Sequence, residues 1–221
     1  MLAKRGLNVL PTRFGNLLRS LRLSREVAVG DVVKGWDVLK TVDFIDAHLG
    51  RDSAILDIGA FASEILPLLA RMGYTSLAGI DFNPRIGGMP SAGVIRYETG
   101  NFLESPYPGG TFNAITAISV IEHGYDGERL FREVSRLLAP GGYFIASFDY
   151  WPEKIESGDL LPFGLSWTIF SQDEVKGMIA KAALYGLEPV GNLDFGAQDK
   201  TIEWQDREYT FAWIALRKGL S

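Results

Sequence analysis

The sequence contains no cysteine and only two histidines, His48 and His123, which narrows the chemistry open to it. Without cysteine there is no disulfide, no thiolate metal site and no cysteine nucleophile. No apolar run is long enough to span a bilayer. Basic residues are also in deficit, with a net charge of −5. Because a phosphate backbone requires a basic surface, nucleic acid is not expected as the main partner. We expect a cytoplasmic protein.

Acidic residues are missing from the first 25 positions, which carry six lysines and arginines. Apolar residues in this segment follow the spacing of one helix face. The favoured interpretation is a helix packed on the main domain with a solvated basic face. Binding to an anionic membrane surface and an organelle-targeting segment are the alternatives. The residues of the apolar face are Leu10, Phe14, Leu17, Leu18 and Leu21.

The length of 221 residues fits one substantial core with an appendage. Residues 30–49 have a second helical pattern that includes Trp36. We therefore predict an N-terminal helical extension or lid over residues 1–49, and a main domain over residues 50–221. The sequence does not indicate an oligomeric state.

The central stretch of the chain is residues 53–64, Ser-Ala-Ile-Leu-Asp-Ile-Gly-Ala-Phe-Ala-Ser-Glu. A short apolar run that ends in Asp57 and Ile58 is typical of a strand buried on both faces of a parallel sheet. Small residues from Gly59 onward indicate a turn, and Ser63 is placed to cap the helix that follows. A strand, a turn and a helix start together form a ligand-binding crevice in open α/β sheets.

A second buried strand, residues 76–81, ends in Asp81, which lies 24 positions after Asp57. An acid at the end of the second strand can accept hydrogen bonds from both ribose hydroxyls of an adenosine cofactor. Capping of a helix near Pro84 is the alternative role for Asp81. A third strand is expected at residues 95–102.

The second half of the sequence continues the alternation of strands and helices. A buried strand leads into Ser119, Glu122 and His123, and a helix over residues 126–138 is followed by Pro-Gly-Gly and a further strand at 143–148. Residues 149–168 form a long aromatic connection. Ser171 and Glu174 have the spacing of a capping box. The last two strands, at 187–195 and 209–216, are separated by a turn-forming stretch at 196–206, which fits an antiparallel pair.

Three of these motifs resemble those of the class I S-adenosylmethionine-dependent methyltransferases: strand–acid–glycine turn, Asp81, and the strand that ends in Glu122-His123. The usual glycine turn has three glycines, and this chain has Gly59, Phe61 and Ser63. The resemblance implies an α/β fold that is Rossmann-like, with a seven-stranded, mostly parallel sheet, helices on both faces and an antiparallel last strand. It also implies S-adenosyl-L-methionine as the cofactor.

The resemblance assigns a role to several residues. Glu122 and His123 are candidates for a catalytic base, and a purely structural role for the pair stays open. Some relatives bind a metal through an acid three residues before this pair; here that position is Ser119, so no metal is expected. The cofactor-binding candidates are Asp57, Gly59, Phe61, Asp81, Phe82, Asn101, Phe102 and Ser119.

The aromatic connection and the N-terminal helical region supply the candidates for acceptor contact, which are Trp36, Tyr150, Trp151 and Trp167. Long ordered loops at strand ends often carry specificity. We expect methyl transfer to a small-molecule acceptor, such as a sugar or a lipid-linked metabolite. Two alternatives stay open: a catalytically silent domain of the same fold, and a nucleotide-dependent oxidoreductase, whose Gly-x-Gly-x-x-Gly turn this sequence lacks.

Overall fold

The computed structural model describes residues 17–18, 20–21, 27–30 and 35–220. These residues divide into two compact units, with the boundary between Ser105 and Pro106. The predictions for the basic segment 1–25 lie almost entirely outside the described residues. The division into an extension and a main domain at residue 49 stays a prediction.

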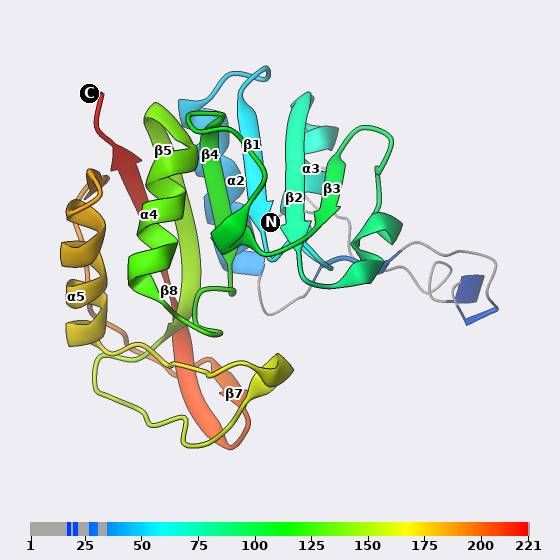
Figure 1. Cartoon of the computed structure of the whole chain (residues 1–221). Coiled ribbons are helices and arrows are strands. Elements are labelled where there is room, and N and C mark those ends of the chain that lie inside the picture. Colours follow the sequence, from blue (N-terminus) through cyan, green and yellow to red (C-terminus); the bar gives the residue numbers. More distant parts are fainter. Residues whose placement is uncertain (1–16, 19, 22–26, 31–34, 221) are drawn as a thin grey trace. The chain divides into compact units, whose positions relative to one another are not determined.

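The first unit carries three parallel strands, with β2 (Ser76–Asp81) between β1 (Ala54–Ile58) and β3 (Arg96–Thr99). Four residues of β1 and four of β2 are buried, as expected for strands covered on both faces. The helices of this unit are α2 (Gly35–His48) and α3 (Ile65–Arg71), with two 3₁₀ helices, η2 (Pro84–Gly88) and η3 (Phe102–Glu104) (Figure 1).

The helix α3 begins one residue later than its sequence pattern predicts. The residue at its cap is Glu64, which makes no side-chain cap bond, although the Ser63 hydroxyl accepts a hydrogen bond from the Ile65 N–H at 3.3 Å. Pro67 falls in the first turn, where a missing N–H has no intrahelical partner to lose. The helix is short, and five of its seven residues are buried.

The second unit is built on the long strand β5 (Leu138–Tyr150), which pairs in parallel with β4 (Phe112–Ile118) and antiparallel with β8 (Arg207–Lys218). The short strand β6 (Leu187–Pro189) pairs antiparallel with the end of β8. This arrangement confirms the predicted reversed last strand. The helices are α4 (Gly127–Leu137) and α5 (Gln172–Ala183), with the 3₁₀ helix η4 (Pro162–Gly164) in the aromatic connection.

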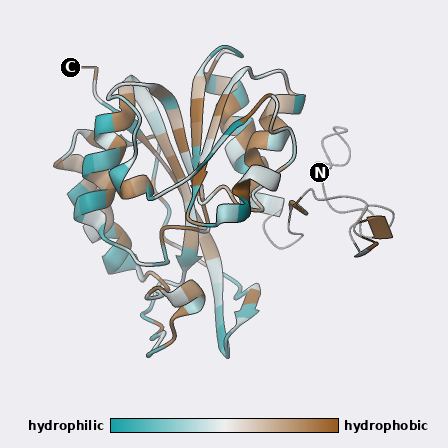
Figure 2. Ribbon diagram, turned by 45° about the vertical axis from the view of Figure 1, so that its right-hand side comes forward, coloured by the Kyte–Doolittle hydropathy of each residue, from teal (hydrophilic) through white to brown (hydrophobic). Residues whose placement is uncertain are grey.

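Both long helices of this unit are capped by a side chain: α4 begins one residue after the predicted start at 126, and α5 begins at the predicted capping box. The Asp126 side chain accepts from the Arg129 N–H at the start of α4, at 3.1 Å. The Ser171–Glu174 capping box is present in full at the start of α5. Figure 2 shows hydrophobic segments along the strands and largely hydrophilic surfaces on α4 and α5. Such amphipathic helices bury one face on a sheet and leave the other in water.

The seven-strand prediction is wrong: the described part of the chain has eight strands. The additional strand, β7 (Ile202–Trp204), lies inside the stretch predicted to be a turn, and it pairs with the first residues of β8. Gln205 and Asp206 join the two strands with φ angles of 53° and 56°. This backbone suits a tight two-residue hairpin. Because β5 ends opposite Thr210, the hairpin extends past the end of β5. The mixed α/β, mostly parallel class is confirmed.

None of the described helices is both long enough and apolar enough to cross a membrane.

Gly79 provides a test of the packing in the first unit. A Cβ at this position would lie 2.8 Å from the Ala60 Cβ and 2.9 Å from side-chain carbons of Leu66 and Tyr97. We predict that Gly79→Ala lowers the free energy of unfolding by about 1–3 kcal/mol, because this core has no room for another methyl group. Denaturant unfolding would measure the change.

The matched control is Gly177→Ala, in the middle of α5, where a Cβ would meet nothing within 4 Å. This variant should be more stable than the wild type by about 0.5–1 kcal/mol, because alanine favours the helix. Equal stability of Gly79→Ala and the wild type would contradict the packing described for β2.

Candidate functional site

The turn after β1 depends on a left-handed glycine. Gly59 has φ of 67°, and its N–H donates to the Ile80 carbonyl of β2 at 3.0 Å. The Ala60 N–H donates to the same carbonyl at 3.3 Å, and Ala62 is also left-handed, with φ of 64°. Phe61 and Ser63 are not among the residues with positive φ. The two positions where the chain departs from the three-glycine pattern therefore do not need glycine for their backbone conformation.

Asp81 holds this turn in place from the end of β2. One carboxylate oxygen accepts a hydrogen bond from the Phe61 N–H at 3.0 Å, and the other accepts from the Asn83 N–H at 2.7 Å. Asn83, rather than Asp81, caps η2, through its side-chain oxygen and the Arg85 N–H. A carboxylate offers about four acceptor positions, so Asp81 keeps capacity for further donors.

The Phe61 ring packs into a cluster on one side of the turn. The buried members of this cluster are Val29, Ala60, Ile86 and Met89, and Phe61 is half-buried against them. Segment 27–30 is bound here through two backbone hydrogen bonds, Val27 N–H to Gly88 O at 2.8 Å and Gly30 N–H to Ala62 O at 3.3 Å. The side chain is thus accommodated without displacing the turn backbone.

Asp57 lies on β1 beside Gly79 and is 1% exposed. The pKa of Tyr97 on β3 is raised, mainly by burial of the Tyr97 side chain and also by the charge of Asp57. The Tyr97 hydroxyl donates to the Pro90 carbonyl. Tyr97 therefore stays protonated and neutral beside the buried acid at physiological pH.

The other cofactor candidates of the first unit follow β2 and β3. The Asn101 side-chain oxygen accepts from the Leu103 N–H at 3.0 Å, which caps η3. Phe102 is buried, whereas Phe82, next to Asp81, is 64% exposed. Trp36 is the second residue of α2 and is half exposed under the ammonium group of Lys40, so it does not anchor the core.

In the second unit, Ser119 follows β4 in a left-handed conformation, with φ of 52°. Its N–H is held by Ser147 of β5, at 3.0 Å from the carbonyl and 3.2 Å from the hydroxyl. The Ser119 hydroxyl itself is buried and has no hydrogen-bond partner among the described residues. An unpaired hydroxyl on a strained residue is a candidate ligand contact.

The Glu122–His123–Gly124 segment is joined to the aromatic connection by backbone pairing. The Thr168 N–H donates to the Glu122 carbonyl at 2.9 Å, and the Gly124 N–H donates to the Ser166 carbonyl at 2.7 Å. His123 and Trp167 form the bridge between these bonds. The structure therefore brings together the catalytic candidates and one of the acceptor candidates, although they lie far apart in the sequence.

Asp149 anchors this pairing from the end of β5 and was not among the predicted site residues. It is 4% exposed, and its carboxylate accepts from the Trp167 indole N–H at 2.8 Å. Burial, the charge and hydrogen bond of Asp149, and the charge of Glu122 all raise the pKa of Tyr209 on β8. An acid at the end of a buried strand is the same sequence signal that marks Asp81, and it could have identified Asp149.

The remaining acceptor candidates differ in exposure. Tyr150 is buried, and its hydroxyl donates to the Phe195 carbonyl at 2.6 Å. Trp151 is half-buried with the ammonium group of Lys200 over its ring, and it packs against the cluster of Trp167, Ile169 and Tyr209. No group of three or more His, Asp or Glu side chains in the described ranges could hold a metal ion.

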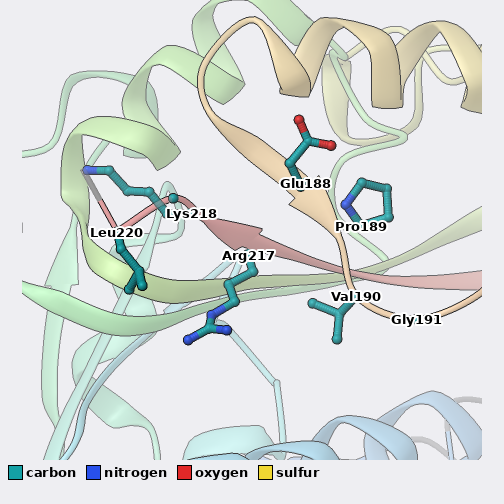
Figure 3. A pocket seen from close by; sticks show the side chains of 8 residues that line it. Glu188, Pro189, Val190, Gly191, Arg217, Lys218 and Leu220 are labelled. Carbon is teal, nitrogen blue, oxygen red and sulfur yellow. The ribbon is translucent and has the colours of Figure 1, made fainter.

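A surface hollow lies elsewhere on the second unit, between the end of β8 and β6 (Figure 3). The two basic side chains that line it already bind backbone carbonyls. The Lys218 ammonium donates to the Ser135 and Leu138 carbonyls, and the Arg217 guanidinium donates to the Gly141 carbonyl. Arg217 pairs with Tyr143, at the opposite end of the β5–β8 ladder from Tyr150. The hollow is therefore remote from Glu122 and His123.

The buried hydrogen bond between Tyr209 and Asp149 gives a pH-dependent prediction. Tyr209→Phe should lower the free energy of unfolding by about 1–3 kcal/mol at pH 7, because a buried acceptor loses its donor. A tyrosine whose pKa is raised by folding stabilises fully below its ordinary pKa of about 10, and this contribution is lost as pH rises. The stability difference between wild type and variant should therefore shrink above pH 10 in denaturant titrations. A difference that grows with pH would contradict this assignment.

The comparisons with known proteins agree with this geometry. Residues 56–146 match the family described as Methyltransferase domain. Methyltransferase str2 of Strobilurus tenacellus is 32% identical over 117 residues, which cover 52% of this chain and 42% of that protein. Demethylmenaquinone methyltransferase of Deinococcus radiodurans is 31% identical over 133 residues, which cover 56% and 52%.

Solved structures extend the likeness over more of the chain. The crystal structure of the [4+2]-cyclase SpnF aligns with a TM-score of 0.64 at 17% identity, over 82% of this chain and 81% of that one. At this identity the likeness shows the fold. The matches span about half or less of the length of the curated relatives. The match over residues 56–146, the order of the motifs and the fold together support assignment to the class I S-adenosylmethionine-dependent methyltransferase family.

Proposed function

We propose that this chain binds S-adenosyl-L-methionine and transfers its methyl group to a small-molecule acceptor. The observation that carries the proposal is the turn after β1, where left-handed Gly59 and the Asp81 carboxylate hold the backbone in one conformation. A preformed turn of this kind, at the carboxyl end of a parallel strand, is where α/β proteins bind adenosine cofactors.

Asp81 is proposed to bind the ribose. Its two oxygens each accept one backbone N–H and retain acceptor positions for the two ribose hydroxyls. Hydrogen bonds to a carboxylate are stronger than those to a neutral acceptor, so this residue should contribute much of the binding energy. Exposed Phe82 lies next to it and is proposed to cover one face of the adenosine.

Three further residues are proposed as cofactor contacts. Asn101 uses its side-chain oxygen to cap η3, and the amide retains two N–H donors and one oxygen lone pair for an adenine edge. Ser119 offers a hydroxyl that has no partner among the described residues. Gly59 allows the backbone to approach a ligand closely, because it has no Cβ.

When bound, S-adenosylmethionine supplies a methyl group that is already activated by its positively charged sulfur. The chain's own task is then to orient the acceptor and exclude water, which is catalysis by proximity. Where the acceptor is a hydroxyl, its proton must leave as the new C–O bond forms. His123 is proposed to take that proton, with Glu122 in support. The pairing with residues 166–168 fixes the backbone on which His123 is carried.

The acceptor is proposed to be a small molecule, with sugars and lipid-linked metabolites among the candidates, rather than nucleic acid, because the chain is acidic overall. A non-methylating domain is the second candidate, because Phe61 and Ser63 replace two glycines and one fold can host unrelated chemistries. Calorimetry separates these candidates: micromolar binding of S-adenosylmethionine without NADH binding supports the methyltransferase, and no binding of either ligand supports the silent domain.

Removal of the Asp81 carboxylate tests the cofactor site. Asp81→Ala should weaken S-adenosylmethionine binding by about 2–4 kcal/mol, because two charge-assisted hydrogen bonds to the ribose are lost. Isothermal titration calorimetry would measure the change, and circular dichroism would establish that the variant is folded.

Asp81→Asn keeps one oxygen acceptor for the turn and helps to separate loss of the ligand contact from loss of the turn. Asp52→Asn, an exposed acid before β1, is the matched charge control and should bind like the wild type. Unchanged affinity in Asp81→Ala would remove this residue from the site.

His123 can be tested against the other histidine of the chain. His123→Ala should leave cofactor affinity intact and slow methyl transfer by roughly 10²-fold, if the acceptor is a hydroxyl that needs a base. The readout is S-adenosylhomocysteine release with an acceptor found by screening. His48→Ala, on α2, should have wild-type turnover. Equal rates for both variants would assign His123 a structural role.

A further inference from the structure

Four aromatic side chains form a continuous row from the core of the second unit to its surface. Trp167 meets Trp204 edge to face at 4.9 Å, Trp204 meets His123 at 6.5 Å, and His123 meets Phe163 at 5.1 Å, with interplanar angles of 81–88°. We call these four residues the aromatic row. Its inner end, Trp167, is 3% exposed, and its outer end, Phe163, is 82% exposed.

The inner end of the row is held by contacts from several segments. Trp167 is bound to Asp149 through its indole N–H and is paired with His123 through the backbone. Trp204 lies on β7, which is held by the β8 hairpin. Three different segments of the chain therefore position the row in advance, which lowers the cost of ordering a binding surface.

The outer end is held in a strained conformation. Phe163 has φ of 58° and ψ of 16°, and Gly164 after it has φ of 78°. The turn is closed by hydrogen bonds from the Gly164 N–H to the Leu161 carbonyl and from the Leu165 N–H to the Pro162 carbonyl. A left-handed phenylalanine is unfavourable, and this one also leaves its ring in water. Strain of this kind concentrates at functional sites.

The sequence neighbours of Phe163 are apolar and uncharged. Leu161 and Leu165 are 63% and 38% exposed, and no charged residue occurs from Leu160 to Gln172. Scattered apolar residues on a surface are ordinary, but three within five positions, beside an imidazole, form a patch. A charged ligand placed here would lose hydration without gaining an opposite charge from this segment.

We propose that the aromatic row and its apolar patch form the acceptor wall, and that the acceptor is an uncharged molecule with an aromatic ring and a hydroxyl. The ring packs on Phe163, and the hydroxyl lies at His123. The inference rests on the proposed methyl transfer and makes its acceptor class specific: Phe163 is the specificity-determining residue. A free sugar, which offers no aromatic ring, is disfavoured.

The test uses three probes with the full chain in saturating S-adenosylhomocysteine. We expect 2-naphthol to bind in titration calorimetry, and 2-naphthoate and methyl glucoside to bind at least tenfold more weakly. Phe163→Ala should weaken 2-naphthol binding about tenfold, the upper end of what an aromatic contact contributes. Phe163→Leu keeps the apolar bulk without the ring and should fall between the two.

Leu184→Ala is the matched control, because Leu184 is 81% exposed at the end of α5, away from the row. It should bind 2-naphthol like the wild type. No 2-naphthol binding, or equal binding by Phe163→Ala and the wild type, overturns the proposal. So does a Phe163-dependent affinity for anionic vesicles or a Phe163-dependent dimer, because either would give the patch another occupant.

These experiments distinguish failure of the acceptor proposal from failure of the proposed methyl transfer. If S-adenosylmethionine binds and 2-naphthol does not, methyl transfer stands and the acceptor class falls. If 2-naphthol binds through Phe163 and S-adenosylmethionine does not bind, the aromatic row is a binding site and the domain has an activity other than methyl transfer.

Discussion

The first unit depends on the Asp81 carboxylate, which binds the chain at two points. Its oxygens accept the Phe61 N–H, from the turn after β1, and the Asn83 N–H, from the start of η2. One acid thus fixes the conformations that follow two neighbouring strands, and it does so at the edge where an adenosine cofactor is proposed to bind. Since hydrogen bonds to a charged acceptor are worth about 1.5–3 kcal/mol each, they stabilise this conformation of the turn without a ligand.

The second unit uses an acid in a similar way, with a different donor. Asp149 lies in the buried part of β5, one residue before the strand ends, where it accepts from the Trp167 indole N–H and is also hydrogen-bonded to Tyr209. A buried carboxylate is costly unless it is hydrogen-bonded, so these partners restrict where Trp167 can lie. Because the Trp167 backbone bridges to His123, the constraint extends to the proposed base. Both units therefore order a functional segment from a carboxylate at a strand end.

Local patterns predicted those features that depend on neighbouring residues. The buried run before Gly59, the acid that ends β2, and the capping box at Ser171 are all in the structure as expected, because strand burial and helix capping are encoded within a few positions. The hairpin of β7 and β8 was missed because its turn residues are Gln205 and Asp206, without the Asn-Gly or Asp-Gly signal. The Asp149–Trp167 hydrogen bond joins residues 18 positions apart across a loop. The spacing of apolar residues in the sequence cannot predict a contact of this kind. The roles assigned to the cofactor and acceptor candidates stay predictions.

The loss of two glycines from the usual turn is best understood position by position. A glycine is required where φ is positive or where a Cβ would collide, and in this turn the left-handed residues are Gly59 and Ala62. The backbone of Phe61 is not left-handed; its N–H binds Asp81, and its ring packs against Val29 and Met89. What the turn needs at this position is a donor, which any residue except proline supplies. Ala62 bears the strain, of about 1–2 kcal/mol for a left-handed residue with a side chain, and two hydrogen bonds at its own peptide groups, to Met89 and from Gly30, offset part of it. The altered sequence thus keeps the geometry of the turn, which favours a working cofactor site over a silent one.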